Sequence, residues 1–313
     1  MTTVYLDNNA TTQVAPEVLE AMLPYFSKFY GNPSSMHSFG GQVARKIREA
    51  REQVAALIGA QPDEIIFTSC GTESDNAAVR SALYSSPEKR HILTSRVEHP
   101  AIRALCAHLA GQGYRITELA VDKDGCLDMD QYEKNLTPDT VIVSLMWANN
   151  ETGVIFPVEE ASRMARERGI PFHTDAVQAA GKIPIDMKQN AVDMMSISGH
   201  KLHAPKGIGI LYVRKGTKFS PFMIGGHQER ERRGGTENTP SIIGLGKACE
   251  LAAQRLDREN TYVRQLRDRL ETALLKAIPQ SRVNGSTLHR LPNTTNISFE
   301  FVEGEGILLM LDQ

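Results

Sequence analysis

The stretch Asp193-Met194-Met195-Ser196-Ile197-Ser198-Gly199-His200-Lys201 indicates the fold, because it has the pattern of a buried strand that ends in polar side chains. Apolar segments of strand length recur along the chain and alternate with longer segments of helical periodicity. We expect strands at residues 64–68, 91–95, 141–146, 170–173, 194–198 and 209–213, and helices at 76–84 and 158–168. The alternation predicts an α/β fold with a mostly parallel sheet, since parallel strands need helical crossovers.

The composition is that of an ordinary globular protein, with 41% hydrophobic residues, 23% charged residues and a net charge of -2. This charge argues against binding of nucleic acid by bulk attraction. No apolar run approaches the ~20 residues of a membrane span, and the N-terminus lacks the pattern of a signal peptide, so we expect no membrane association and a cytoplasmic location. The four cysteines form no C-x-x-C pair, which argues against a structural zinc site and a disulfide framework.

The 313 residues exceed the usual size of one compact core. We expect an N-terminal segment at 1–14 that packs with a small domain, a large domain at 15–258 and a small C-terminal α+β domain at 259–313. Within the last part, residues 260–277 have the pattern of an amphipathic helix, and residues 293–301 alternate like a strand. The helical pattern that begins at 304 has no cap or stop signal, so we expect an incomplete small domain and a fragment of a longer enzyme.

Ligands of open parallel sheets bind at the carboxyl ends of the strands, so the polar residues that follow the predicted strands are candidates for a site. Residues 65–74 run from a strand through a small turn with Gly71 and Thr72 into a helix. Free amides and the helix dipole at such a turn attract a phosphate group. The alternative is that the Ser and Thr side chains of this turn only cap the helix.

Asp175 and Lys201 each follow a predicted strand, and these two strands succeed one another along the chain. An acid in that place can pair with a buried cation, or it can cap the following helix. Lys201 is the best candidate for a Schiff-base lysine, because burial and the neighbouring His200 would lower its pKa. The alternative is a solvated surface lysine.

His99 follows the predicted strand at 91–95. Its ring could stack on a planar cofactor, although the local sequence alone favours a helix-capping or solvated histidine. The phosphate turn, the histidine, the aspartate and the lysine occur in the chain order of the fold-type I pyridoxal phosphate enzymes. In such an enzyme the aspartate keeps the ring nitrogen protonated, which makes the ring an electron sink.

Several further stretches of the chain have the sequence of family motifs. They are Tyr5-Leu6-Asp7-Asn8-Asn9-Ala10-Thr11-Thr12, Gly31-Asn32-Pro33-Ser34-Ser35, Trp147-Ala148-Asn149-Asn150-Glu151-Thr152-Gly153, residues 198–207, Gly225-Gly226-His227-Gln228-Glu229-Arg230 and Gly235-Thr236-Glu237-Asn238. On these residues, and over essentially its whole length, the chain resembles the class V cysteine desulfurases, and most closely their NifS branch.

The resemblance implies a role for each matching residue. Lys201 would carry pyridoxal 5'-phosphate, Asp175 would pair with the pyridine nitrogen, and His99 would stack on the ring and help to move protons. The remaining residues would contact the ring hydroxyl and the substrate (Gln178, Asn150) or the phosphate (Gly71, Thr72, Ser198, His200), and Thr236 would come from the neighbouring subunit of a homodimer.

The resemblance also implies a reaction, in which L-cysteine gives L-alanine and a persulfide on an enzyme cysteine. The sulfur would then pass to an iron–sulfur scaffold or a nitrogenase-assembly protein. In this family the persulfide cysteine and the arginine for the substrate carboxylate follow the segment that matches residues 302–311, and this sequence ends at Gln313. Cys70 lies in the predicted phosphate turn, which is a poor place for a mobile nucleophile.

Other functions remain open from the sequence alone. A related enzyme that acts on selenocysteine or transfers an amino group would need the same cofactor site. The chain could also be a non-catalytic, dimer-forming protein that binds the cofactor. A nucleic-acid patch at residues 229–233 is not expected, because charges of both signs mix there. His200 and His203 lack acidic or thiol partners nearby in sequence, so we expect no metal site.

Overall fold

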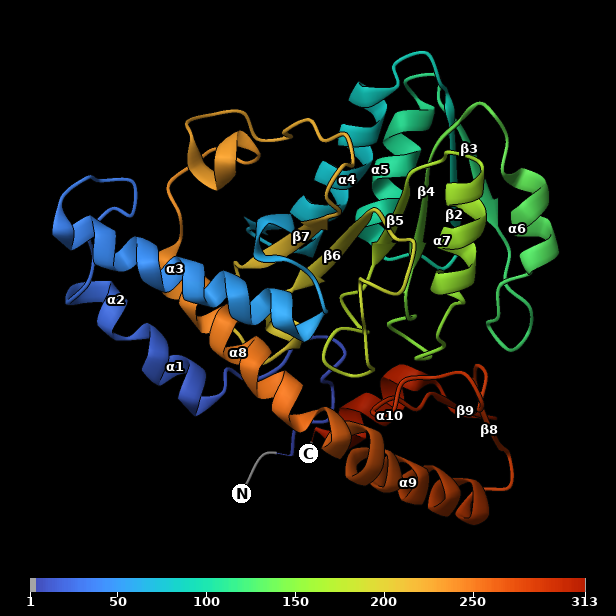
Figure 1. The fold of residues 1–313 in the computed structure, drawn as a ribbon. Helices are drawn as coiled ribbons and strands as arrows, with labels where there is room; N and C mark the ends of the chain where they lie inside the picture. Colours follow the sequence, from blue (N-terminus) through green and yellow to red (C-terminus); the bar gives the residue numbers. More distant parts are fainter. Residues whose placement is uncertain (1–3, 313) are drawn as a thin grey trace.

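A seven-stranded sheet forms the centre of the computed structural model, which describes residues 4–312 (Figure 1). The first three residues of the predicted N-terminal segment and Gln313 lie outside the described residues. The strand order is β1-β7-β6-β5-β4-β2-β3. The strands are β1 (Ile65–Thr68), β2 (His91–Ser95), β3 (Arg115–Leu119), β4 (Thr140–Met146), β5 (Phe172–Asp175), β6 (Met194–Ser198) and β7 (Gly209–Val213).

The neighbouring strands β3, β2, β4, β5 and β6 run parallel to one another. Strand β7 pairs antiparallel with both β6 and β1. The prediction of an α/β fold with a mostly parallel sheet is therefore confirmed. Helices lie in the connections from β2 to β3, from β3 to β4 and from β4 to β5, whereas the parallel connection from β5 to β6 consists of turns. The helices up to the last strand of this sheet are α1 (Pro16–Met22), α2 (Pro24–Ser27), α3 (Ser38–Leu57), α4 (Gly71–Ser85), α5 (Pro100–Ala110), α6 (Met129–Asn135) and α7 (Val158–Glu167).

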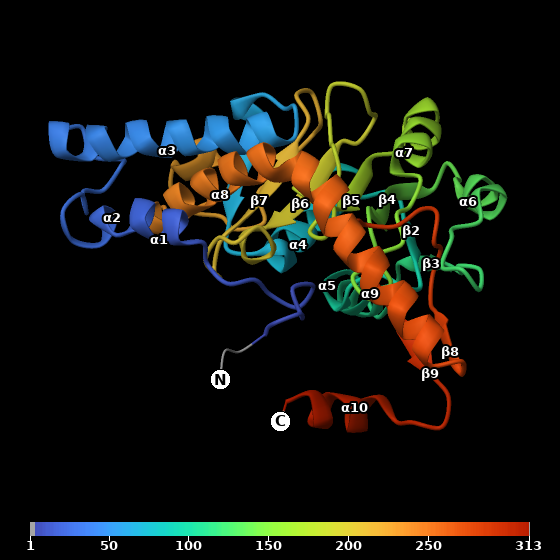
Figure 2. The same ribbon diagram turned by 90° about the horizontal axis from the view of Figure 1, so that it is seen from below.

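Apolar side chains of successive strand residues enter two different cores, one on each face of the sheet. Met194 and Leu211 pack with α4 and α5, whereas Met195 and Ile210 belong to the core with α1, α3, α7 and the later helix α8 (Thr239–Arg258). Figure 2 shows these two helical layers on opposite sides of the strands. The buried strands are apolar on both faces because each face is covered by helices.

The observed strands differ in detail from the predicted ones. The strand expected at 170–173 begins at Phe172, because Pro171 has no amide hydrogen to donate, and it ends at Asp175. Strand β3 was not predicted, because it lies at the edge of the sheet and only one of its side chains is buried. An edge strand exposes charged side chains such as Arg115 and Glu118, so it lacks the apolar run of a buried strand.

The helix predicted at 260–277 is the second half of a longer helical segment. Helix α8 continues through a π-turn (Glu259–Val263) into α9 (Arg264–Ala277). The strand expected at 293–301 is shorter than predicted, since only β9 (Ile297–Phe299) pairs, with β8 (Ser281–Val283). Residues before β9 serve other contacts instead, as Thr294 accepts a hydrogen bond from Arg267 at 2.8 Å through its carbonyl oxygen.

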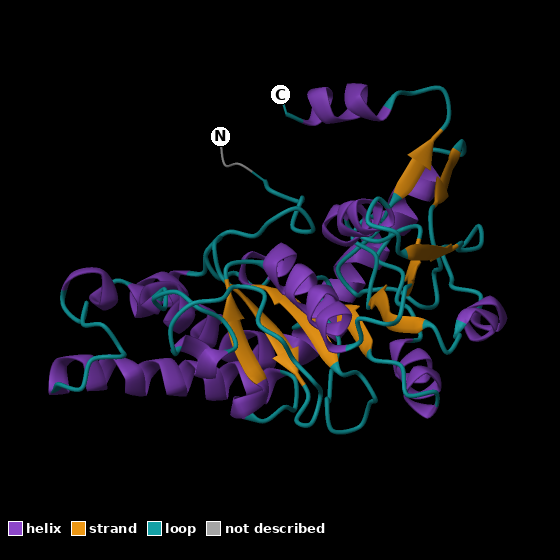
Figure 3. Cartoon of the chain, turned by 90° about the horizontal axis from the view of Figure 1, so that it is seen from above, coloured by secondary structure: helices purple, strands orange, loops and turns teal. Residues whose placement is uncertain are grey.

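The last helix, α10 (Gly304–Leu311), stands apart from the other helices (Figures 2 and 3). The remaining helical elements of residues 4–312 are short 3₁₀ turns at Pro62–Glu64, Gly199–Lys201 and Gln228–Glu231. None of the helices within residues 4–312 is long and apolar enough to cross a membrane. The division into domains at residues 14 and 258 stays a prediction.

Candidate active site

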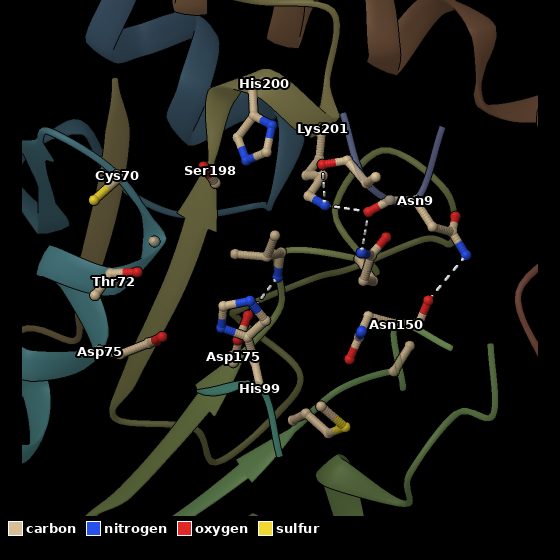
Figure 4. Close-up of a pocket in the computed structure, with 16 residues that line it drawn as sticks. Asn9, Cys70, Thr72, Asp75, His99, Asn150, Asp175, Ser198, His200 and Lys201 are labelled. Carbon is tan, nitrogen blue, oxygen red and sulfur yellow. Dashed lines mark hydrogen bonds between the residues drawn. The ribbon is translucent and has the colours of Figure 1, made fainter. Parts of the chain in front are cut away.

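A cavity of about 300 Å³ lies at the carboxyl ends of β4, β5 and β6, beside the start of α4. With the exception of Thr236, every residue predicted for the site lines this cavity. Figure 4 shows Thr72 and Asp75 on one side of it and Asn9 and Asn150 on the other. The lining consists of Asn9, Ala10, Cys70, Gly71, Thr72, Asp75, His99, Met146, Ala148, Asn150, Asp175, Val177, Gln178, Ser198, His200 and Lys201.

Lys201 projects from the 3₁₀ turn that directly follows β6. Its Nζ donates hydrogen bonds to the carbonyl oxygens of Asn9 and Ala10, the latter at 2.9 Å. Burial lowers the pKa of Lys201, and the negative charge of Asp175 partly opposes this effect. A lysine whose pKa is lowered by burial holds a larger share of neutral, nucleophilic amine at neutral pH. The alternative of a solvated surface lysine is wrong.

Asp175 is the last residue of β5, and the residue is only 7% exposed. Its Oδ1 accepts a hydrogen bond from the amide of Val177 at 2.9 Å. Burial raises the pKa of Asp175, whereas this amide and the charge of Lys201 lower it. Asp175 therefore bonds the turn after its strand and also presents a buried acid to the cavity. The two interpretations from the sequence, a capping residue and a partner for a buried cation, each hold in part.

The start of α4 is shaped for close approach of a ligand. A Cβ atom on Gly71 would lie 3.0 Å from Cγ2 of Val177, so the tight packing at this position favours glycine. The N-cap residue is Cys70, and no side chain caps the helix there. The interpretation of this turn as side-chain capping by Ser or Thr is therefore wrong, and the first amides of α4 are left without a partner inside the helix.

Ser198 at the end of β6 and His200 in the turn after it also line the cavity. The Nδ1 of His200 lies 3.1 Å from the Thr11 hydroxyl. Burial, followed by the charge of Lys201, lowers the pKa of His200, so its ring is neutral at neutral pH. Together with the amides of Gly71 and Thr72, these side chains can bind an anion such as a phosphate group.

His99 both caps a helix and lines the cavity. It is the N-cap residue of α5, and its Nδ1 accepts a hydrogen bond from the amide of Ala101 at 3.2 Å. Its ring is exposed toward the cavity, near Asp175 (Figure 4). Since the ring is fixed at one nitrogen and open on a face, it can stack on a planar ligand.

Polar residues from distant parts of the chain also line the cavity. Gln178 donates to the carbonyl oxygen of Asn9 at 2.9 Å, and Asn150 donates to the carboxylate of Glu151 at 2.8 Å. Asn9 and Asp75 were not among the predicted site residues. Asn9 reaches the site only through the tertiary fold, whereas an acid inside the otherwise mainly apolar buried face of α4 could have pointed to Asp75.

Thr236 does not line the cavity. It is exposed in the loop 214–238 between β7 and α8. Its predicted contact, with the site of a neighbouring subunit, stays a prediction. Within residues 4–312 no group of three or more His, Cys, Asp or Glu side chains could hold a metal ion.

Comparison with known proteins defines the family. The model of the family described as Aminotransferase class-V matches residues 4–313. The chain belongs to the class-V aminotransferase family. Within it, the chain is 59% identical over 313 residues to a protein of Trichormus azollae named cysteine desulfurase. It is 56% identical over 314 residues to a protein of Azotobacter vinelandii named cysteine desulfurase NifS. Each comparison covers 100% of this chain and 78% of the relative.

The solved structures of the family agree with the fold. A structure described as a NifS-like protein superposes with a TM-score of 0.96 at 38% sequence identity, over 99% of this chain and 86% of that chain. The architecture of this member of the class-V aminotransferase family is therefore that of the fold-type I pyridoxal phosphate enzymes, as the sequence resemblance implied.

Proposed function

We propose that the chain binds pyridoxal 5'-phosphate on Lys201 and is a cysteine desulfurase, which removes sulfur from L-cysteine and leaves L-alanine. The observation that carries the proposal is the single cavity in which Lys201, Asp175 and the start of α4 meet. Relatives that are 56–59% identical over the whole chain and are named cysteine desulfurases support the choice of reaction.

The residues of the cavity fit this cofactor. Asp175 is a buried acid that lacks a cationic hydrogen-bond partner among the described residues, and a protonated ring nitrogen would supply one. Gly71 leaves the backbone open where a side chain would fill the space against Val177. The amides at the start of α4, with Ser198 and His200, provide donors for the phosphate.

Each side chain would perform a distinct task. Bound pyridoxal phosphate would supply an electron sink for the bonds of the substrate's α-carbon. Asp175 would hold the ring nitrogen in its protonated form, and His99 would fix the plane of the ring. The Lys201 amine would stand within the cavity, where it could take or return a proton. Gln178 and Asn150 would bind the ring hydroxyl and the substrate.

The sulfur transfer needs a thiolate acceptor. The acceptor attacks the substrate sulfur and the C–S bonding pair stays with the substrate carbon, which takes a proton to become alanine. Two cysteines are unsuited to this role, because burial raises the pKa of Cys106 and of Cys249 to about 12. Cys70 lines the cavity but is fixed at the start of α4. Cys126 does not line the cavity, and burial raises its pKa too. We therefore propose that none of the four cysteines of this sequence accepts the sulfur.

The quaternary partners follow from the same proposal. We propose a homodimer in which the loop 214–238 carries Thr236 to the phosphate of the other subunit, and a sulfur acceptor from iron–sulfur cluster assembly. The name of the Azotobacter vinelandii relative supports a role in nitrogen fixation.

Absorption spectroscopy tests the cofactor assignment. The purified chain, mixed with pyridoxal phosphate, should develop the visible band of a lysine-bound cofactor, and Lys201→Ala should abolish it. Lys206→Ala is the matched control, because Lys206 lies five positions away and outside the cavity lining. A band that survives in Lys201→Ala would disprove the assignment of Lys201.

Sulfide release tests the reaction. The chain should be assayed with L-cysteine and a reductant, beside a version extended by the C-terminal segment of the Azotobacter vinelandii relative. We expect release of sulfide and alanine from the extended version, dependent on Lys201. If the original chain releases sulfide and still does so in Cys70→Ala, the proposed origin of the acceptor thiol is wrong. If the extended version prefers selenocysteine to L-cysteine, the proposed substrate is wrong.

A further inference from the structure

A row of polar side chains crosses the sheet beneath the cavity. His173 of β5 lies between Ser144 of β4 and Ser196 of β6, and all three side chains are fully buried. The Nδ1 of His173 lies 2.9 Å from the Ser144 hydroxyl, and Nε2 lies 2.9 Å from the Ser196 hydroxyl. Because alternate residues of a strand share a face, His173 points to the same side of the sheet as Asp175.

Asp75 of α4 completes this row from the helix that covers it. Its side chain is 1% exposed, and its Oδ1 lies 3.6 Å from Nε2 of His173. This oxygen has no hydrogen-bond partner in the described part of the chain, although Asp75 lines the cavity (Figure 4). A buried carboxyl without a partner is much less costly when it is protonated than when it is ionised.

The charges around Asp75 act in the same direction. Burial, and next the charge of Asp175, raise the pKa of Asp75 well above its usual range. Only the neighbouring Ser196 hydroxyl opposes this shift. No cation balances the acid within the row, because burial lowers the pKa of His173 to about 3 and its ring is neutral.

Asp175 has a different environment. Besides the amide of Val177, the positive charge of Lys201 favours its ionised form. Two carboxyls that share one buried site cannot both ionise without a large cost, so the proton stays on the one with fewer donors and cations. Both carboxyls line the same cavity, and their contacts favour the proton on Asp75 and the negative charge on Asp175.

We propose that Asp75 is a positioning residue for Asp175: it remains a neutral carboxyl against His173 and Ser196, which leaves Asp175 as the anion that faces the ring nitrogen of the cofactor. A second anion in this place would disfavour the ionised form of Asp175. This inference rests on the proposed function, since it assigns Asp175 to pyridoxal phosphate.

Infrared spectroscopy tests the protonation of Asp75 without any assay of activity. At pH 7 the difference between wild-type protein and Asp75→Asn should contain the carbonyl band of a protonated carboxyl, with and without the cofactor. Carboxylate bands in that difference would overturn the proposal. If Asp75→Asn does not fold, isotope-labelled aspartate provides the same assignment. The labelled carbonyl band must then persist in wild-type protein and in Asp175→Asn, and its absence from either would also overturn the proposal.

Cofactor affinity tests the division of roles. The concentration of pyridoxal phosphate that half-saturates the visible band should rise at least about tenfold in Asp175→Asn. It should stay within about threefold of wild type in Asp75→Asn, because the amide imitates a neutral carboxyl. Equal losses in the two variants would overturn the proposal. Failure of the proposed function would look different, since wild-type protein would then form no band while the infrared result would stand.

Discussion

Glu98, which precedes His99 in the chain, holds a buried carboxyl. Its Oε1 accepts hydrogen bonds from the Ser95 hydroxyl at 2.6 Å and from the Met146 amide at 3.0 Å. Oε2 has no partner among residues 4–312. Burial raises the pKa of Glu98 from its ordinary value of 4.5 to about 8. At neutral pH the folded protein therefore holds a proton on Glu98 that the unfolded chain has lost.

This proton makes stability depend on pH. Between pH 4.5 and about 8 the folded state binds more protons at Glu98 than the unfolded state, so the contribution of Glu98 to stability falls as pH rises. Glu98→Gln keeps the acceptor for Ser95 and Met146 and cannot ionise. From urea unfolding at pH 5 and pH 8, we expect the variant to gain a few kcal/mol relative to wild type at the higher pH.

The exposed Glu118 provides the control for this measurement. Glu118→Gln should change the free energy of unfolding by less than about 0.5 kcal/mol at either pH. If Glu98→Gln and wild type differ by the same amount at pH 5 and at pH 8, Glu98 is not protonated in the folded protein.

The loop 214–238 is held in an unfavourable backbone conformation by a buried ion pair. Glu229, Arg230 and Glu231 have positive φ angles of 46°, 58° and 64°. Such a conformation costs roughly 1–2 kcal/mol for each residue other than glycine. Arg51 of α3 offsets this cost, because NH1 and NH2 each bond a carboxylate oxygen of Glu229 at 2.7 Å. The amide of Phe67 donates to the same carboxylate at 3.0 Å.

Removal of one partner should destabilise the protein strongly. Arg51→Met leaves the Glu229 carboxylate buried without its cation, and we expect a loss of about 3–5 kcal/mol in urea unfolding. Limited proteolysis should also cut the loop 214–238 faster. The exposed pair of Lys46 and Glu49 is the control, since Glu49→Gln should cost less than about 1 kcal/mol. A loss in Arg51→Met no larger than in that control would refute the role of the pair.

At the scale of the whole molecule, Asn9 links segments that lie far apart in the sequence. Its side-chain amide donates to the Thr294 hydroxyl at 3.1 Å and to the carbonyl of Asn150 at 3.2 Å. Its own carbonyl accepts hydrogen bonds from Gln178 and Lys201. The N-terminal segment therefore bonds both the residues around the cavity and the C-terminal part of the chain.

Loss of this side chain should loosen the C-terminal part. Asn9→Ala removes two donated hydrogen bonds, and we expect the free energy of unfolding to fall by about 1–3 kcal/mol. The amide of Leu291, which donates to Gly153 at 2.8 Å, should exchange its hydrogen faster. The exposed Asn8 is a matched control, and Asn8→Ala should cost less than about 0.5 kcal/mol. Similar effects of the two substitutions would show that the contacts of Asn9 are unimportant.

Features with a local pattern were predictable from the sequence. The strands β2, β6 and β7 begin and end where predicted, because buried strands between two helical layers are continuous apolar runs. The edge strand β3 and the short β8 were missed, since neither has such a run. The π-turn between α8 and α9 was also missed, because no proline or glycine interrupts the helical pattern there.

The sequence by itself determined the α/β class and the order of the residues that end the strands, because side-chain polarity changes where a buried strand reaches solvent. Only the tertiary structure decided which residues meet. The parallel pairing of β5 and β6 brings Asp175 beside the turn of Lys201, the N-terminal segment adds Asn9, and α4 places Asp75 against the row of His173. Such contacts join residues far apart in the chain, and no local pattern encodes them.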